Sequence, residues 1–302
     1  MSDGWSYVQT RIYMDTLVTI EIPLPGDCDR AAGLVENAFG WFAEVERVCN
    51  RFDGASELRR LCETAGRPVP VTPLLLRAIE MSLEVARDSG GAFDPTVGAA
   101  MEARGFNRSY LTGTAGSSGI AVSDTTYRDV ILDPVAGTVM LRQPLLLDLG
   151  AIAKGFAIDL AGAELAPLGN FAINAGGDVL VRGRNAAGAP WQVGVKDARR
   201  PDQLLSVVSL TEGAVCTSGD YERRTESGHH LLEPGSQAPA ASLASVTVVA
   251  PSAMLADALS TAAFVLGAEN ASQFLQRQGV EGLMFTSDGR LISTPGLATY
   301  LA

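Results

Sequence analysis

Two oxygen-bearing side chains stand four residues apart in an apolar segment near the C-terminal end of the chain. The segment 252–267, S-A-M-L-A-D-A-L-S-T-A-A-F-V-L-G, predicts a helix that is apolar almost all round and therefore buried. Residues four apart project from one face of a helix, so Asp257 and Thr261 point the same way. A carboxylate and a hydroxyl are hard oxygen ligands of the kind that Mg²⁺ accepts alongside substrate phosphates. The alternative is that Thr261 bonds back to its own helix while Asp257 pairs with a lysine.

Four charged side chains interrupt a second apolar stretch, residues 145–178. They are Asp148, Lys154, Asp159 and Asp178. Because a buried charge without a partner is costly, such groups need counter-charges or ligands. Gly150 and Gly155 mark places where the backbone can approach another group closely. The pattern fits two interpretations equally well: a ligand-binding stretch, or a strand, a tight turn and a buried helix whose charges are paired structurally.

The helices and strands that must position these groups can be predicted from hydrophobic periodicity and from capping and turn residues. Amphipathic or capped patterns predict helices over 29–48 and from 73 to about 89, the second with Thr72 as its N-cap. Alternation and turn residues predict strands, and they lie at 16–22, 130–132, 139–141, 179–182, 191–195, 205–210 and 245–250. A surface loop is expected at 107–126, and a hairpin at 282–293.

The length, composition and net charge of the chain exclude several classes of protein. With 302 residues, 47% of them hydrophobic and 19% charged, the chain suits one large globular unit or two closely packed lobes. A net charge of −11 argues against a nucleic-acid partner and against an anionic membrane surface. The four cysteines are far apart, with no C-x-x-C pair, and there are two histidines, so neither a zinc site nor a disulfide framework is expected.

The N-terminal segment M-S-D-G-W-S-Y-V-Q-T-R has no apolar core and no small-residue cleavage site, so it does not read as a secretory signal. No apolar run is long and charge-free enough to span a bilayer, and no membrane anchor is expected. We therefore expect a cytoplasmic protein, with a trimmed exported form as the alternative.

Several motifs in order carry a family resemblance. D-L-G-A-I-A-K-G-F-A-I-D at 148–159, followed by N-A-G-G-D at 174–178, resembles the FAD:protein FMN transferases, the ApbE-type flavin transferases. The other matching segments are M-D-T at 14–16, C-N-R-F-D-G-A-S-E-L-R-R-L at 49–61, G-G-A-F-D-P-T-V-G at 90–98, A-V-C-T-S-G-D-Y-E-R-R at 214–224, G-H-H-L-L-E-P at 228–234 and A-D-A-L-S-T-A at 256–262. Two departures stand out: Asp15 replaces a glycine that is typical of the family, and Glu233 replaces an aspartate.

The resemblance implies a fold and a reaction. It implies an α+β fold, with mixed sheets flanked by helices, and a single flavin transferase unit over residues 1–302. That unit would have two intimately packed lobes with the active site between them. The implied reaction moves FMN from FAD to a Ser or Thr hydroxyl of a target flavoprotein through a phosphoester bond, releases AMP and depends on Mg²⁺. Catalysis of this kind rests on positioning and on cationic stabilisation of phosphoryl oxygens.

The resemblance also assigns roles to residues. Mg²⁺ would be held by the side chains of Asp257 and Thr261 and by the backbone carbonyl of Ala151. FAD would be contacted by Asp148 and by Lys154, the latter near phosphate. The flavin would be lined by Met14, Phe52, Ala92, Phe93, Asp94 and Leu231. His230 is the candidate base that takes the proton from the target hydroxyl, since a neutral imidazole can do so near pH 7.

Three other functions stay open. The same site could hydrolyse FAD to FMN and AMP, with water in place of the protein hydroxyl. It could be a flavin carrier without chemistry, for which the two departures are the best support. Without the resemblance, the chain reads as a cytosolic binding protein with no nucleotide role.

Overall fold

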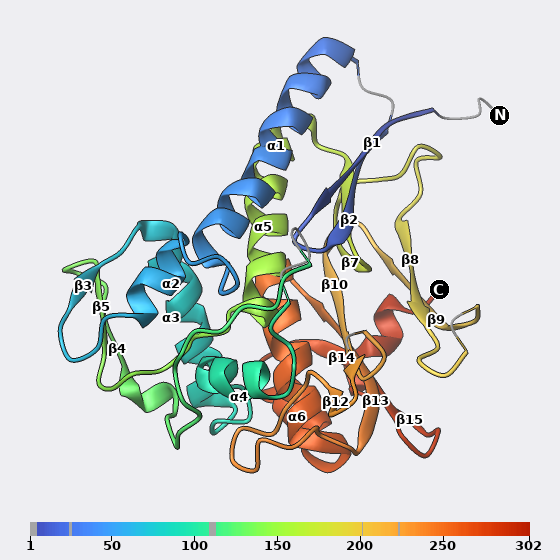
Figure 1. Ribbon diagram of the computed structural model, residues 1–302. Helices are drawn as coiled ribbons and strands as arrows, with labels where there is room; N and C mark the ends of the chain where they lie inside the picture. The colour runs from blue at the N-terminus through green and yellow to red at the C-terminus, as the bar shows by residue number, and fades with distance from the viewer. Residues whose placement is uncertain (1–4, 24–25, 109–112, 201, 223) are drawn as a thin grey trace.

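An eight-stranded antiparallel sheet in the order β1-β2-β6-β7-β10-β13-β14-β15 forms the centre of the fold in the computed structural model (Figure 1). Its strands are β1 (Ser6–Tyr13), β2 (Thr16–Pro23), β6 (Phe171–Ala175), β7 (Asp178–Arg182), β10 (Glu212–Gly219), β13 (Leu243–Ala250), β14 (Glu281–Thr286) and β15 (Leu291–Ser293). The structure describes residues 5–23, 26–108, 113–200, 202–222 and 224–302.

Three small antiparallel units accompany this sheet. They are β3-β5-β4, with β3 at Val69–Pro70, β4 at Val130–Asp133 and β5 at Thr138–Leu141; the hairpin of β8 (Trp191–Lys196) and β9 (Leu204–Leu210); and the pair of β11 (Arg224–Thr225) and β12 (Gly228–His229). In Figure 1 the three-stranded unit lies beside α2 and α3, on the far side of the helices from the main sheet.

The helices gather on one side of the main sheet. They are α1 (Cys28–Cys49), α2 (Glu57–Cys62), α3 (Pro73–Asp88), α4 (Gly98–Ala103), α5 (Gly150–Leu165) and α6 (Ala253–Arg277). The long α1 packs along α5, and α5 packs on α6 (Figure 1). The expected α+β fold with flanking helices is confirmed, and the bounds of α1 and α3 agree with the predicted helices to within about a residue.

Alternation along the strands divides the apolar residues between two cores. On β7, Val179 and Val181 face the β8–β9 hairpin and the C-terminal turn η4 (Pro295–Tyr300). On β10, Ala214 and Cys216 face the opposite way, into the main core beneath the helices. Because side chains alternate with period two, Asp178 and Ser218 fall on the helix side of these two strands. The sheet therefore directs two polar groups towards α5 and α6.

Residues 145–149 do not form the strand with which one of the two interpretations of the stretch 145–178 began. They form no ladder, yet Leu145, Leu146 and Leu147 are 1% exposed or less. Their backbone groups bond to separate segments: the Leu146 carbonyl accepts from Gly98 N, and Leu147 N donates to the Cys62 Sγ. An extended buried segment remains stable because its polar groups are satisfied by other parts of the chain.

The end of the first part of α6 also differs from expectation. The sequence predicts that this helix stops at Gly267, and the structure shows a break there, with φ 78°, followed by further helix to Arg277. At the break Ala268 N donates to the Ser242 hydroxyl, 3.2 Å away. This bond replaces a lost helical partner, and glycine tolerates the left-handed backbone, so the helix resumes with a kink.

The tip of the β1–β2 hairpin accommodates the first departure from the family pattern. Met14 and Asp15 have φ values of 51° and 63°, and Tyr13 pairs with Thr16 across the two-residue turn. Such a turn needs two left-handed residues, and aspartate is among the side chains that tolerate this conformation. The turn lies against Gly176, where a Cβ would meet the Thr16 Oγ1 at 2.3 Å.

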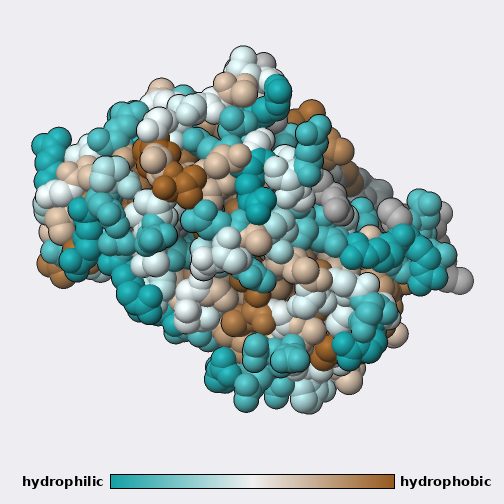
Figure 2. All heavy atoms as spheres, turned by 60° about the horizontal axis from the view of Figure 1, so that its bottom comes forward, coloured by the Kyte–Doolittle hydropathy of each residue, from teal (hydrophilic) through white to brown (hydrophobic). Residues whose placement is uncertain are grey.

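The surface carries no single large apolar face on the side shown in Figure 2, where small hydrophobic patches are scattered among hydrophilic residues. Across the part of the chain that the structure describes, no helix has both the length and the apolar character to cross a bilayer.

Two buried glycines of α5 provide a matched test of its packing. A Cβ at Gly155 would lie 2.4 Å from the Ala253 carbonyl oxygen, whereas a Cβ at Gly162 would meet the Leu180 Cδ2, the movable end of a side chain. We expect Gly155→Ala to lower the free energy of unfolding by about 1–3 kcal/mol, because the Ala253 backbone cannot move aside as the Leu180 methyl group can. Both variants gain about 1 kcal/mol of helix propensity over glycine. Gly162→Ala should therefore cost less, because the Leu180 side chain can move aside. Urea unfolding of both variants decides, and equal stabilities would contradict the close contact.

Candidate functional site

The contact between α5 and α6 brings together several of the predicted residues. The Asp159 carboxylate accepts from Ala253 N at 2.7 Å and Met254 N at 2.9 Å. One turn earlier on α5, Gly155 N donates to the Asp257 Oδ2 at 3.2 Å. Residue numbers therefore fall on one helix as they rise on the other, so the helices cross in antiparallel fashion. By the same register, Ala151 and Thr261 lie at the same end of the crossing.

The bond from Gly155 N has a consequence for the preceding turn. In a regular helix this N–H bonds to the carbonyl of the residue four positions earlier, which is Ala151. The same N–H here also faces the Asp257 carboxylate. Donation from Gly155 N to Asp257 competes with the helical bond. The Ala151 carbonyl oxygen is then more available to another partner, such as a metal ion. Ala151 itself is half-buried in the first turn of α5.

Lys154 lies between two carboxylates. Its ammonium forms an ion pair with the Asp178 Oδ2, and the Asp178 Oδ1 accepts from Thr217 N at 2.9 Å. Asp178 is 2% exposed. Although burial alone would lower it, the negative charges of Asp178 and Asp257 raise the pKa of Lys154 above its ordinary value. One cation thus faces two carboxylates, and the cluster has an excess of negative charge that can accept a further cation.

Hydroxyl groups continue the polar cluster towards β10. Ser218 Oγ lies 2.7 Å from Ser260 Oγ and 2.9 Å from Thr261 Oγ1. Thr261 is therefore bonded across to the sheet, which differs from the alternative in which it bonds back to its own helix. The same alternative pairs Asp257 with a lysine, and the structure agrees with it in part. The charge of Asp257 raises the pKa of Lys154, but the ion pair of Lys154 is with Asp178.

The donor set fits a magnesium ion bound together with a ligand's phosphates. Asp257, Thr261 and the Ala151 carbonyl offer three oxygen atoms of the hard type that Mg²⁺ prefers, and Mg²⁺ usually binds through one or two carboxylates and completes its shell with phosphate and water. Among the residues that the structure describes, no group of three or more His, Cys, Asp and Glu side chains is placed to hold a metal by itself. A site of this kind would rely on the ligand.

A second group of predicted residues surrounds the start of α5. Asp148 Oδ2 accepts from Arg51 Nε at 2.7 Å, and its Oδ1 accepts from Gly150 N at 2.7 Å. The Arg51 guanidinium lies over the Phe52 ring, 4.1 Å from its centroid, and Phe52 is 36% exposed. Asp148 and Phe52 are therefore linked through a residue that was not among the predicted site residues.

The remaining predicted flavin contacts are divided between surface and core. Met14 is half-buried at the tip of the β1–β2 hairpin, and Ala92 is half-buried after α3. Phe93 and Leu231 are buried and belong to the main core. Their side chains already have packing roles, so a flavin would meet their backbone or one edge.

Asp94 is bonded within the protein at both carboxylate oxygens. Its Oδ1 accepts from Thr96 N at 2.9 Å and Thr96 Oγ1 at 2.7 Å, and its Oδ2 accepts from Tyr127 N at 2.9 Å. Burial raises the pKa of Asp94, and these hydrogen bonds oppose the shift. The carboxylate fixes the loop 90–98 against the turn η2 (Tyr127–Asp129).

The two adjacent histidines differ in environment. The His229 ring is buried, with its Nε2 2.8 Å from the Ala240 carbonyl and its Nδ1 accepting from Leu231 N at 3.3 Å. Since a carbonyl only accepts, Nε2 carries the proton and the ring is neutral. His230 is half-buried, and its ring contacts Phe106, whose carbonyl accepts from Arg51 Nη2 at 2.5 Å. His230 is thus linked to the group around Asp148 through Phe106 and Arg51.

Three residues that were not predicted as site residues also belong to the two groups around Asp148 and Asp178. Arg51 and Ser218 have the contacts described above, and Tyr221 is the third. Burial, followed by the negative charges of Glu222 and Asp178, raises the pKa of Tyr221 to about 12. These residues lie in the segments N-R-F-D and S-G-D-Y, where polar residues adjoin small ones. Such a pattern alone does not show whether a side chain points into a site.

A cleft of about 410 Å³ lies elsewhere, between α3, α5, β7 and the start of α6. Arg77, Phe156, Asp159, Leu180 and Arg182 are among its lining residues. None of the predicted site residues lines it. We therefore assign the site from the side-chain clusters rather than from this cleft.

Charge counting predicts opposite stability effects for two members of the cluster. We expect Lys154→Met to lower the free energy of unfolding by about 3–5 kcal/mol, because it strands the buried Asp178 carboxylate. Asp257→Asn should leave the metal-free stability unchanged or higher, since Lys154 and Asp178 still balance each other. Chemical unfolding in the presence of EDTA measures both. A large loss from Asp257→Asn would show that its charge is a structural partner of Lys154.

Comparisons with known proteins identify the family of the chain. The model of the ApbE family matches residues 14–284. A protein of Rhodobacter capsulatus named FAD:protein FMN transferase is 33% identical over 82% of this chain, which spans 49% of that relative's length. The Treponema pallidum protein of the same name is 32% identical over 96% of this chain and 87% of its own.

Solved structures show the same fold. The crystal structure of the ApbE protein from Thermotoga maritima superposes with a TM-score of 0.88 at 30% identity, covering 99% of this chain and all of that one. The flavin transferase ApbE from Vibrio cholerae gives 0.85 at 22% identity, over 99% of this chain and all of its own, and this second likeness concerns the fold alone. With its family model matched over nearly its whole length and its fold shared with these structures, the chain belongs to the ApbE family.

Proposed function

We propose that this chain transfers FMN from FAD to a Ser or Thr hydroxyl of a target flavoprotein and releases AMP. The observation that carries the proposal is the cluster at the α5–α6 crossing, where Asp257, Thr261 and Lys154 meet. It combines oxygen ligands for a divalent cation with a fixed positive charge, and both are needed to hold a pyrophosphate in an acidic protein. Curated relatives named FAD:protein FMN transferase support the same reading.

The reaction balances as a phosphoryl substitution. The acceptor hydroxyl oxygen forms a new bond to the phosphorus on the FMN side of the pyrophosphate. The bond from that phosphorus to the bridging oxygen breaks, and AMP leaves with the bridging oxygen. The hydroxyl proton must pass to a base, and we assign this step to His230, which lies half-buried beside Phe106.

The residues of the chain divide the remaining tasks. Asp257, Thr261 and the Ala151 carbonyl would hold Mg²⁺, which supplies charge stabilisation at phosphoryl oxygens when bound. Lys154, kept protonated by Asp178 and Asp257, offers its ammonium to phosphate. Phe52 offers a partly exposed aromatic face to the isoalloxazine ring, and Met14 stands at the tip of the neighbouring hairpin. The single-unit organisation and the cytoplasmic location stay predictions from sequence.

A transfer assay tests the function directly. We expect FAD, Mg²⁺ and a flavoprotein fragment bearing an acceptor Ser or Thr to give the fragment with one added FMN and an equal amount of AMP, as measured by mass spectrometry and chromatography. Asp257→Asn should slow transfer at least about a hundredfold, since cation stabilisation is worth several kcal/mol.

Asp159→Asn is the matched control, because this carboxylate lies one turn along the same helix pair and accepts from backbone groups at the start of α6. It should cost stability and keep transfer. FMN and AMP formed at the same rate without acceptor would instead establish a pyrophosphatase. Tight FAD binding with no product would establish a carrier.

Metal dependence is a separate prediction. Because every proposed ligand is an oxygen, we expect transfer to stop after exhaustive EDTA treatment and to return with Mg²⁺ or Mn²⁺. In Asp257→Asn the Mg²⁺ concentration for half-maximal activity should rise by at least about tenfold, as loss of a charged ligand weakens the site. Full transfer in the presence of EDTA would remove the cation from the mechanism.

A further inference from the structure

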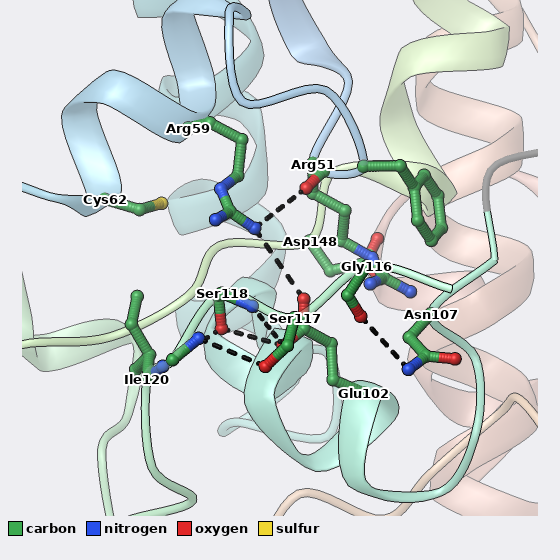
Figure 3. A network of polar contacts seen from close by, with 12 residues as sticks. Arg51, Arg59, Cys62, Glu102, Asn107, Gly116, Ser117, Ser118, Ile120 and Asp148 are labelled. Atoms are coloured by element: carbon green, nitrogen blue, oxygen red, sulfur yellow. Dashed lines mark hydrogen bonds and ion pairs between the residues drawn. The ribbon is translucent and has the colours of Figure 1, made fainter. Parts of the chain in front are cut away.

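Arg51 is a buried cation between two residues of the proposed flavin site. It follows α1 directly and is 5% exposed, although arginine is usually a surface residue. Figure 3 shows its guanidinium beside Asp148, near the start of α5. Neither the family motif nor the predicted site gives it a role, so its position needs a separate account.

The guanidinium holds three different groups in place. Its Nε donates to Asp148 Oδ2 at 2.7 Å, and its Nη2 donates to the Phe106 carbonyl at 2.5 Å. Its flat face covers the Phe52 ring at 4.1 Å. Charge-assisted bonds and cation–π stacking in fixed directions are what the planar guanidinium provides and an ammonium does not.

The stacking leaves one face of Phe52 for a ligand. An aromatic ring has two faces, and Arg51 occupies one of them. Phe52 is still 36% exposed, so a second planar ring that stacks on it must use the face that Arg51 does not cover. A cation on one face of Phe52 thus decides from which side the isoalloxazine ring can stack.

The Arg51 backbone is itself fixed by a second buried arginine. Arg59 Nη1 donates to the Arg51 carbonyl at 3.1 Å and lies 3.7 Å from Glu102 Oε1. Glu102 in turn accepts from Ser118 N at 3.0 Å and Ser118 Oγ at 2.7 Å (Figure 3). These contacts of Arg59 thus go to the Arg51 backbone and to Glu102, whereas the Arg51 guanidinium contacts Asp148 and Phe52.

One nitrogen of Arg51 has no hydrogen-bond partner among the described residues. The Nη1 atom is buried and unbonded in that part of the chain. An unmade bond of a buried charged donor is destabilising, so the fold alone does not explain why this cation is retained. Incomplete satisfaction of this kind is expected where a group serves function as well as packing.

We propose that Arg51 is the positioning residue for the flavin ring: it holds Phe52 and Asp148 in the orientation that the ring requires. The inference rests on the proposed function, and it concerns the ring end of FAD rather than the phosphate end. It separates two neighbouring arginines of one network, Arg51 as a ligand-orienting residue and Arg59 as a structural one.

The test compares two ligands that represent opposite ends of FAD. FMN carries the flavin and a phosphate, and ADP carries the pyrophosphate without the flavin. With Mg²⁺ present, we expect Arg51→Lys to weaken FMN binding by at least about tenfold in calorimetry and to leave ADP binding within about twofold. The visible circular dichroism of bound FMN should change as well, because the ring loses its fixed orientation. Arg59→Lys should alter neither ligand's affinity by more than about twofold.

Each other outcome has a defined meaning. Equal losses of FMN and ADP binding in Arg51→Lys would make Arg51 merely structural, and unchanged FMN binding would also overturn the inference. If wild-type protein binds FAD and transfers FMN while Arg51→Lys behaves like it, the inference alone fails. If wild-type protein binds no FAD, the proposed function fails and this inference with it.

A second variant protects the test against misfolding of Arg51→Lys. Phe52→Leu changes a partly exposed side chain and keeps Arg51 in place. It should give the same selective loss of FMN binding, and FMN affinity equal to that of wild type would overturn the inference. Where both variants fold, the double variant should lose little more than either single one, since the two side chains act as a unit.

Discussion

The backbone contact between α5 and α6 is the constraint on which the rest of the structure depends. No side chain fits between Gly155 and the Ala253–Met254 peptide, and the closeness lets Asp257 reach Gly155 N and Asp159 reach the start of α6. Both carboxylates act on backbone groups of the opposite helix. The polar cluster therefore depends on the close packing of the two helices, because these bonds form only at the short interhelical distance that Gly155 permits.

This contact also explains why an acidic protein can be expected to bind a polyanion. The net charge of −11 is repulsive to phosphate at long range. At the crossing, however, the carboxylates are arranged around a lysine and a candidate cation site rather than facing solvent. Local charge of the correct sign outweighs the average charge of the surface because interactions at short range in a buried setting are screened least.

Much of the fold could be predicted from the sequence, and the limits have physical causes. The caps, periodicity and turns gave α1, α3 and the hairpins, because these signals are local. One of the two interpretations of the stretch 145–178 began with a strand, but the hydrogen bonds of residues 145–149 go to Cys62, Pro95 and Gly98, which no local pattern identifies. The break at Gly267 was visible, whereas the continuation of α6 depends on Ser242, 26 residues away in the chain.

The candidate site was predictable to a similar degree. Spacing placed Asp257 and Thr261 on one face, and resemblance supplied the other candidates, whose contacts with ligand stay predictions. Sequence could not show that Asp94 is bonded internally at both oxygens, or that Lys154 faces two carboxylates, because these facts depend on which residues meet in three dimensions. Arg51 lies in one of the matching motifs, and nothing local in the sequence distinguishes a buried arginine from an exposed one.

The contrast between the two histidines gives this protein a built-in pair of spectroscopic reporters. The chain has only two imidazoles, and they are neighbours in sequence. The His229 ring is held in one tautomer between two backbone groups, whereas the His230 ring borders the proposed flavin site. In nitrogen-15 magnetic resonance, the first gives a signature of the intact fold and the second a signal sensitive to occupancy. A single spectrum of nitrogen-15-labelled protein can thus separate loss of ligand from loss of structure without any attached chemical probe.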